Sequence, residues 1–297
     1  MSIETPPAPR SQTATMPAPP AARAPSRRAG FVRVARVIWT REVLIYFRDR
    51  ARVVSAMVMP IVMLVIFGEG LGNSVGGLAP GLNYRQFIFP GMVAMTVLMA
   101  SVFSGISVIW DREFGFLREI LVAPVSRTAI GIGKVAGGAT IAMFQGVVMF
   151  IFAPILGVHL SLLVVVQLLA VMALMSLTMT SVGIALGTRL KSVESFQMVS
   201  QLTIMPTMFL SGIFFPVNNV PQWMEVLVKV NPVTYAVAPV RAIALGDQLS
   251  SAPGGASAVV NVDVLGHTLS TVESLGILAA FGALILTVAV QSFQRRE

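Results

Sequence analysis

The chain has 297 residues, of which 55% are hydrophobic and 11% are charged, with a net charge of +8 and no cysteine. So few polar residues could not cover a water-soluble protein of this size, so the composition predicts a protein that lies in a lipid bilayer. The lack of cysteine excludes disulfides, cysteine-ligated metals and a thiol nucleophile. The basic residues flank apolar segments, which argues against nucleic-acid binding and favours a role in membrane orientation.

The N-terminal region is predicted to have two parts. Residues 1–30 are rich in Pro, Ala, Ser and Thr and contain no sustained apolar run, so they are predicted to form a disordered cytoplasmic tail. Residues 31–52 mix Trp39, Tyr46 and Phe47 with several arginines. This mixture predicts a helix in the membrane interface whose arginines extend toward the headgroups, the alternative being an ordinary basic flank of the first span.

Six apolar segments follow, each long enough to cross a bilayer as a helix of about 20 residues. They are residues 53–72, 87–110, 135–156, 162–187, 197–215 and 275–293. Membrane β-strands would be nearer 10 residues with alternating polarity, so the predicted fold class is an all-α integral membrane protein with six transmembrane helices. Lysine and arginine concentrate at both termini and in the loops 111–134 and 188–196, which predicts that these parts are cytoplasmic.

The charged loop between the second and third segments is predicted to form a short helix at 111–124. Asp111 is expected to be its N-cap, and Pro124 ends it. Phe114, Leu117 and Leu121 then share one face, an apolar ridge among charges that suits docking into a groove of another protein. The alternative is a helix that lies on the membrane without a partner.

Two short apolar helices are predicted within residues 216–274. In VPQWMEVLVKVNP, the residues Trp223, Val226, Leu227 and Val230 form one apolar helix face, and Asn231-Pro232 ends that helix. The next apolar segment, VTYAVAPVRAIAL, is too short to span a bilayer. Together the two helices, at about 220–245, predict a re-entrant element at the outer surface.

Three stretches carry a resemblance to a known family. The first is DREFGFLREILVAPVSRTAIGIGKVAGG, which resembles the cytoplasmic loop of ABC-2-type transporter permeases, especially the daunorubicin-resistance type of drug exporter. The second is FLSGIFFPVNNVPQWMEVLVKVNPVTYAVAPVRA, which resembles the family's other signature, and YRQFIFPGM fits the opening of its second span. The similarity covers roughly residues 35–296 and implies one six-span permease domain at 53–297.

The resemblance also implies partners. In that family the loop after span two forms a coupling helix that sits in a cleft of a separate ATP-hydrolysing subunit, and the segment after span five forms re-entrant outer helices. The implied ATPase-docking residues are Asp111, Arg112, Glu113, Phe114, Gly115, Leu117, Arg118, Glu119, Leu121, Pro124 and Arg127. The expected assembly contains a pair of ATP-binding subunits, which would hold MgATP, and a second permease subunit that is identical or related.

This chain itself is not expected to be an enzyme or to hold a cofactor. The nearest approach to a nucleotide-binding loop is Gly133-Lys134, but Thr128 stands in place of the first glycine and Val135 in place of the magnesium-binding Ser or Thr. Neither of the two histidines has a carboxylate cluster or a second ligand nearby in the sequence, so no catalytic residue and no metal site are predicted.

Four residues are candidates for the translocation pathway or its gate: Glu69, Gln201, Phe215 and Trp223. Glu69 is the only acidic residue in a predicted span, and a side chain that reaches the membrane interface is its alternative interpretation. Gln145, Gln167 and Gln201 are more often cross-links between helices than ligands of a cargo. The glycine spacings 133/137 and 183/187 permit close helix packing but also occur readily by chance.

The sequence therefore predicts the transmembrane subunit of an ATP-driven ABC exporter in a bacterial-type cytoplasmic membrane. Its substrate would be hydrophobic or amphipathic, drug-like or lipid, as in drug efflux and antibiotic resistance. Glycolipid or polysaccharide export is the alternative within the family. An ion-coupled carrier or a membrane scaffold is the alternative outside it, although carriers usually pair ionisable groups deep in the membrane.

Overall fold

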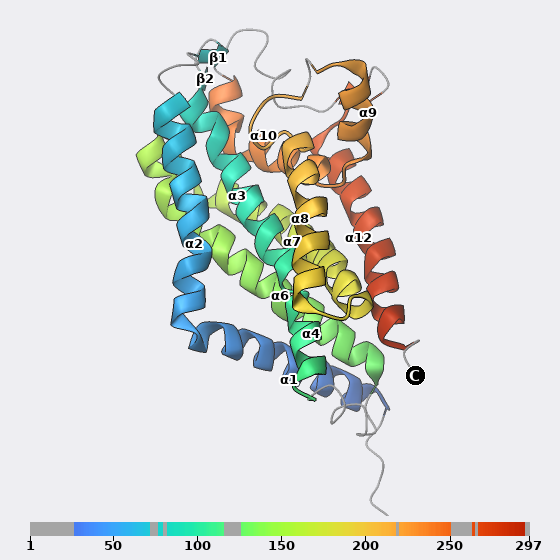
Figure 1. Cartoon of the computed structure of the whole chain (residues 1–297). Coiled ribbons are helices and arrows are strands. Elements are labelled where there is room, and N and C mark those ends of the chain that lie inside the picture. The colour runs from blue at the N-terminus through green and yellow to red at the C-terminus, as the bar shows by residue number, and fades with distance from the viewer. Residues whose placement is uncertain are drawn as a thin grey trace, which may run out of the picture.

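A computed structural model describes residues 27–71, 77–79, 82–115, 126–217, 220–250, 263–264 and 267–294. In this part of the chain long helices run side by side as a bundle, and α1 lies across one end of it (Figure 1). The helices are α1 (Arg27–Arg48), α2 (Arg50–Val65), α3 (Tyr84–Phe103), α4 (Ile106–Glu113), α6 (Arg127–Met149), α7 (Leu162–Arg189), α8 (Val193–Leu210), α9 (Gln222–Val230), α10 (Thr234–Ser250) and α12 (Thr271–Gln294). The predicted all-α membrane fold is confirmed.

Short elements complete the described fold. A π-helical segment, η1 (Ile66–Leu71), continues α2, and two 3-10 turns, η2 (Phe150–Phe152) and η3 (Pro154–Leu156), follow α6. The strands β1 (Gly77–Ala79) and β2 (Leu82–Asn83) form one antiparallel pair, and β3 (Asp263–Val264) and β4 (His267–Thr268) form another. These pairs are too short to form a sheet layer, so the helices alone build the core.

The first helix begins at Arg27, four residues before the predicted boundary at residue 31. It ends at Arg48, and α2 starts at Arg50 in a new direction, so that Asp49 alone connects the two helices. The Asp49 carboxylate accepts a hydrogen bond of 3.0 Å from the backbone N–H of Arg52, which caps α2. A polar cap between two helices therefore makes the bend (Figure 1).

Five helical segments of the described chain are long and apolar enough to cross a membrane: 50–68, 84–113, 127–152, 162–189 and 271–293. The fifth predicted span forms α8, which falls short because Glu194, Gln197 and Gln201 lower its hydropathy. Helix α8 still runs the length of the bundle beside α3 and α7, from the end that holds α1 to the end that holds α9 (Figure 1).

The predicted outer helices correspond to α9 and α10, which meet at an angle of 87°, the geometry of a broken span or a re-entrant element. Three side chains of the NPVTY motif build the bend. Asn231 donates to the Thr207 carbonyl of α8 at 2.7 Å and accepts from the Val233 N–H at 3.0 Å. The Thr234 and Tyr235 hydroxyls donate to carbonyls near the end of α9 at 3.0 and 2.6 Å.

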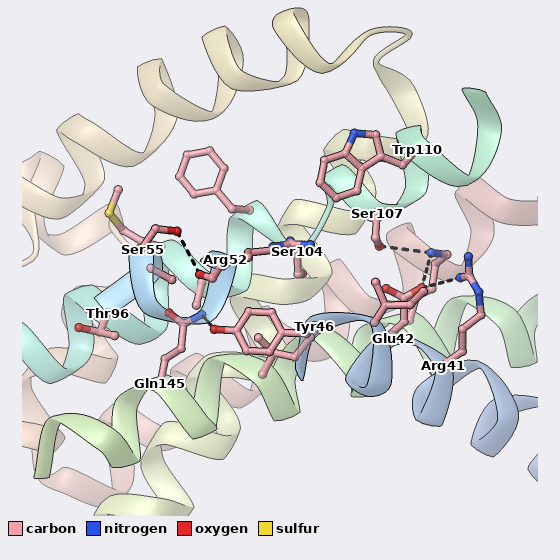
Figure 2. A pocket seen from close by; sticks show the side chains of 18 of the residues that line it. Arg41, Glu42, Tyr46, Arg52, Ser55, Thr96, Ser104, Ser107, Trp110 and Gln145 are labelled. Carbon is pink, nitrogen blue, oxygen red and sulfur yellow. Dashed lines mark hydrogen bonds and ion pairs between the residues drawn. The ribbon is translucent and has the colours of Figure 1, made fainter. Parts of the chain in front are cut away.

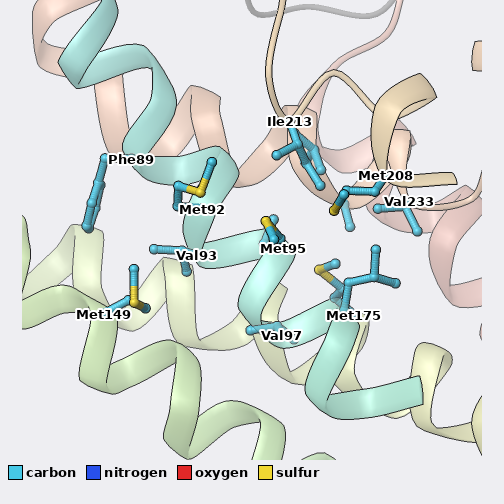
Figure 3. Close-up of a cluster of buried hydrophobic side chains, with 14 of the residues drawn as sticks. Phe89, Met92, Val93, Met95, Val97, Met149, Met175, Met208, Ile213 and Val233 are labelled. Atoms are coloured by element: carbon cyan, nitrogen blue, oxygen red, sulfur yellow. The ribbon is translucent and has the colours of Figure 1, made fainter. Parts of the chain in front are cut away.

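The core is centred on α3, most of whose side chains are buried. Figure 3 shows methionines from four helical segments meeting there: Met92, Met95, Met149, Met175 and Met208. Flexible thioether side chains fill irregular gaps between helices that cross at different angles. These methionines therefore serve as packing groups and are not available as a lipid-facing surface.

The second glycine spacing brings α7 against α3 and α4. A Cβ atom at Gly183 would collide with the Val102 carbonyl, and one at Gly187 would collide with the Gly105 carbonyl. Gly105 in turn faces the Gly183 carbonyl. The spacing 183/187 thus marks a real contact between backbones, of the kind that small residues permit in membranes.

Candidate functional site

The end of the bundle that carries α1 brings together the residues with the most functional potential. Helix α1 lies against α6 at two glycines: a Cβ at Gly133 would be 2.7 Å from the Ala35 carbonyl oxygen, and one at Gly137 would be 2.7 Å from Glu42 Cβ. Because only glycine leaves this space, α1 can approach the α6 backbone closely enough to place its polar side chains between helices.

Four charged side chains form a compact group in this contact, which we call the ion cluster: Arg41 and Glu42 of α1, Asp111 of α4 and Lys134 of α6. The Arg41 Nη2 lies 2.7 Å from Asp111 Oδ1. The Lys134 Nζ lies 2.5 Å from Asp111 Oδ2 and 2.9 Å from Glu42 Oε1, and donates to the Ser107 hydroxyl at 3.2 Å (Figure 2).

Burial makes the ion cluster structurally important. The Lys134 side chain is 1% exposed and that of Asp111 is 7% exposed. Two cations face two carboxylates, so the charges balance within the group. Removing one partner of a buried ion pair leaves an uncompensated charge and typically costs about 3–5 kcal/mol. The ion cluster therefore holds α1, α4 and α6 in one arrangement.

Arg112, the neighbour of Asp111, ties the same end of α4 to α7. Its guanidinium donates to the Leu190, Gly187 and Thr188 carbonyls at 2.8, 3.1 and 3.3 Å. A cation is favoured there because the last carbonyls of a helix carry partial negative charge. The final turn of α4 is thus fixed to α1 and α6 through Asp111, and to α7 through Arg112.

The predicted docking residues divide into two groups at this point. The expectation that Asp111 is the N-cap of a new helix is wrong, because α4 continues through it to Glu113 and its carboxylate is buried in the ion cluster. Arg112 likewise bonds within the chain. In contrast, Glu113 is exposed and Phe114 is 82% exposed, and Gly115 follows with a left-handed φ of 77°.

The remaining docking residues are less constrained by the structure. Arg127 is the first residue of α6, where the chain re-enters the described fold. Five others lie outside the described residues: Leu117, Arg118, Glu119, Leu121 and Pro124. Their role in docking stays a prediction from the sequence. Among the described docking residues, Phe114 is the most exposed large hydrophobic side chain, and it lies one residue before the described chain ends at Gly115.

A cavity of about 440 Å³ lies beside the ion cluster, in the angle between α1 and α2 and against α3, α4 and α6. Tyr46 of α1 and Gln145 of α6 meet in its wall, with the Gln145 amide donating to the Tyr46 hydroxyl at 2.9 Å (Figure 2). Burial raises the pKa of Tyr46, while the bond to Gln145 and the charge of Arg52 oppose this shift. The phenol is therefore neutral and contributes polarity without charge.

The four pathway candidates do not meet in one place. Gln201 lies on the exposed side of α8, and Trp223 is 67% exposed on α9. Phe215 is partly buried and packs against the main hydrophobic core. Glu69 falls within η1, and its side chain lies outside the described residues.

Two buried cations were not recognised as structural residues from the sequence. Lys134 was interpreted as a basic residue of the loop 111–134 and as part of an incomplete nucleotide-binding loop, whereas it is buried within α6. Arg241 of α10 is 2% exposed, bonds to the Gly212 carbonyl and lies 3.8 Å over the Phe87 ring. Among the described residues, no group of three or more His, Asp or Glu side chains has a metal-binding arrangement.

A comparison with known families explains this architecture. The model of the family described as "ABC-2 type transporter" matches residues 33–245. The chain belongs to the ABC-2 type transporter family. The match begins within α1, includes the ion cluster and α9, and ends within α10. Membership makes the chain a transmembrane subunit of an ABC transporter and a multi-pass membrane protein.

Two relatives agree with this assignment. The inner membrane transport permease YadH of Escherichia coli strain K12 is 28% identical over 209 residues, which are 67% of this chain and 78% of the relative. Nodulation protein J of Rhizobium meliloti strain 1021 is 30% identical over 215 residues, which are 71% of this chain and 81% of the relative. Membership of this ABC transporter family weighs against the ion-coupled carrier and the scaffold.

Proposed function

We propose that the chain is the permease subunit of an ATP-driven exporter that moves a hydrophobic or amphipathic substrate out of the cytoplasm or the inner leaflet. Two permease subunits, identical or related, would work with two ATP-binding subunits that hold MgATP. The observation that carries this proposal is the anchoring of α4: its last turn, which includes the first residues of the coupling helix predicted at 111–124, is bound to α1, α6 and α7.

The anchored turn suggests how the work of ATP hydrolysis reaches the membrane. A force applied to residues 116–125 by a partner subunit acts on Asp111 and Arg112 at one side and on Arg127 at the other. Because buried ion pairs and close glycine contacts do not deform continuously, the helices joined by them respond as a rigid group. ATP binding would then shift the balance between two arrangements of the paired permeases.

The exposed side of α8 supports pairing with a second permease. Met198, Leu202, Met205 and Phe209 are 74%, 76%, 43% and 49% exposed, and they lie along one face of the helix together with Gln201. A continuous face of this kind suits contact with another subunit or with an apolar cargo between subunits. We therefore place Gln201 at the pathway between two permeases and leave Trp223 and Phe215 as candidates for its outer gate.

The substrate class rests on the resemblance and on the apolar character of this face. Drug-like export is favoured by the similarity to daunorubicin-resistance permeases, and glycolipid or polysaccharide export is the second candidate. Uptake of a fluorescent apolar drug into inside-out vesicles, with and without ATP, distinguishes the two substrate candidates. Because the cytoplasmic face of such vesicles points outward, ATP-dependent uptake also identifies the direction of transport as export. ATP-dependent accumulation supports drug export, whereas accumulation of a lipid-linked glycan alone supports the second candidate.

Co-purification tests the partner assignment. The full chain, tagged at its C-terminus, is extracted gently from its native membrane together with Leu117→Asp, which places a charge on the predicted docking ridge. The matched control is Val272→Asp, since Val272 is 78% exposed and is the second residue of α12, whose other end leads to the C-terminus near α1 (Figure 1). We expect an ATP-binding protein with the wild type and the control but not with Leu117→Asp. Recovery of the permease alone from wild-type membranes, even after crosslinking, would overturn the proposal.

A further inference from the structure

Arg52 presents an unusual cation to the cavity between α1 and α2. Its guanidinium lies 5.7 Å from the ring centre of Tyr46 and 5.2 Å from that of Trp110. Within the part of the chain that the structure describes, no carboxylate forms an ion pair with it. Two aromatic faces thus hold the guanidinium in place while its charge stays unneutralised by protein groups.

The other cations that line the cavity are already neutralised. Arg41 and Lys134 belong to the ion cluster, where Asp111 and Glu42 balance their charge. Arg52 therefore gives the cavity a net positive charge of one. A ligand that fits this charge carries a single negative group, because an arginine fork forms strong, charge-assisted hydrogen bonds with phosphate or carboxylate oxygens.

The rest of the cavity wall is largely apolar. Met59 and Pro60 of α2 line one side, and Met99, Ala100 and Phe103 of α3 line the other. The volume of about 440 Å³ lies within the range of roughly 300–1,000 Å³ that is usual for small-molecule sites. A positive group at one end and apolar walls beyond it are the features of a site for an anionic amphiphile.

The position of the cavity points to the membrane as the source of that ligand. Ile45 and Met59 line it and are 45% and 51% exposed, so the cavity opens outward in the angle between α1 and α2. Helix α1 lies across the end of the bundle (Figure 1), and Arg52 is the third residue of the first candidate span, 50–68, where lipid headgroups are expected. Val58 and Val62 continue an exposed apolar face along α2.

We propose that this cavity binds an anionic glycerophospholipid from the leaflet on the α1 side. The phosphate contacts Arg52, where Trp110 and Tyr46 flank it, and one acyl chain begins between Met59 and Met99 and continues along α2. A lipid with the same phosphate and an added choline cation binds more weakly, because its positive group adds to the charge of Arg52. The site is separate from the α8 face that we assign to transport.

Trp110 offers a direct readout of this site. The chain has three tryptophans, so Trp39→Phe and Trp223→Phe together leave only the one at the cavity. This variant is reconstituted into nanodiscs that contain brominated phosphatidylglycerol or brominated phosphatidylcholine with the same acyl chains. Bromine quenches tryptophan fluorescence on close approach. We expect phosphatidylglycerol to quench Trp110 with about tenfold higher apparent affinity than phosphatidylcholine.

Two arginine variants separate the cavity from general surface charge. Arg52→Gln should abolish the preference for phosphatidylglycerol, while Arg50→Gln removes an equal charge from an exposed position two residues away and should leave it intact. Because Arg52 touches Trp110, the ratio between the two lipids is compared within each variant. Equal quenching by the two lipids in the Trp39→Phe/Trp223→Phe protein with Arg52 intact, or equal effects of the two arginine variants, would overturn the proposal.

Two further measurements test the kind of ligand. Ala56→Phe places a ring in the cavity from α2 and should reduce quenching by both lipids, which distinguishes occupancy of the cavity from lipid that covers the protein surface.

In the second measurement, inorganic phosphate and glycerol 1-phosphate are added as competitors. If millimolar amounts of either restore the fluorescence, the cavity is a site for soluble anions and the lipid proposal is wrong. Unchanged quenching supports a site that requires the acyl chain.

Discussion

Lys134 in the N-terminal half of α6 and Asp111 in the last turn of α4 form a buried ion pair, with Nζ and Oδ2 2.5 Å apart. Asp111 is the first residue of the coupling helix predicted at 111–124, and Lys134 lies on α6, the next described helix along the chain. The pair therefore joins α4, which leads into this segment, to α6, which follows it. A partner that moves the segment must move both helices together.

Replacing Lys134 by Met should strongly destabilise the protein. The substitution leaves Asp111 and Glu42 buried with only Arg41 to balance them, at a cost of about 3–5 kcal/mol. Thermal unfolding in detergent, followed by loss of monodisperse protein, measures the change. The control is Lys229→Met, which breaks a partly exposed pair with Glu225 and should cost about 1 kcal/mol or less.

A second substitution tests whether charge balance is the cause. In Glu42→Gln/Lys134→Met the remaining pair, Arg41 and Asp111, is neutral again. The double variant should therefore be more stable than Lys134→Met alone. If the two effects simply add, loss of packing rather than an unbalanced charge explains the destabilisation.

Removing one partner of the hydrogen bond between Gln145 and Tyr46 should destabilise the protein more than removing both partners. Gln145→Leu leaves the Tyr46 hydroxyl buried without its partner and should cost about 1–3 kcal/mol. Adding Tyr46→Phe removes the unsatisfied hydroxyl and should recover most of that loss. A double-mutant cycle on thermal stability measures the coupling, and strictly additive effects would mean that the bond contributes nothing.

Glycine to alanine substitutions should have opposite effects at two positions. At Gly133 the added methyl group meets the Ala35 carbonyl oxygen at 2.7 Å, so Gly133→Ala should weaken the packing of α1 and lower the unfolding temperature. At Gly276 of α12 nothing lies within 4 Å, so Gly276→Ala should be neutral or stabilise the helix by up to about 1 kcal/mol. Equal effects at both sites would show that α1 does not depend on this contact.

Asn231 should be necessary for the bend between α9 and α10. Asn231→Ala removes the bond to the Thr207 carbonyl and leaves the Val233 N–H without its acceptor, which should cost about 1–3 kcal/mol. We expect transport to fall together with stability at physiological temperature. Gln222→Ala, at an exposed position on α9, is the control and should retain both transport activity and thermal stability.

The predicted orientation can be tested because the sequence contains no cysteine. Single cysteines at Ser11 and at Arg296 should react with a membrane-impermeant thiol reagent only after the cells are opened. A cysteine at Ala256, between α10 and α12, should react in intact cells. Labelling of all three positions in intact cells, or the opposite pattern, would contradict cytoplasmic termini.

The parts of the fold that depend on hydropathy could be predicted from the sequence, whereas the site could not. Apolar length predicted the helices that became α2, α3, α6, α7 and α12, because a bilayer leaves a long apolar segment little choice. The rule that Asp favours helix N-caps was misleading at Asp111, which lies inside α4 and is buried. Whether a carboxylate is buried depends on a cation 23 residues away on another helix, Lys134, and no local pattern reports that contact.

Helix α2 differs from its neighbours in how firmly it is held. Its buried residues are only Met57, Pro60 and Leu64, and the one-residue connection at Asp49 joins it to α1, which is itself fastened to α6. A rotation of α1 and α6 would therefore move the base of α2 while few side chains resist its tilt. We expect the tilt of α2 relative to the rest of the bundle to change during the transport cycle. ATP hydrolysis would then alter how widely the interior of the bundle opens to the surrounding lipid.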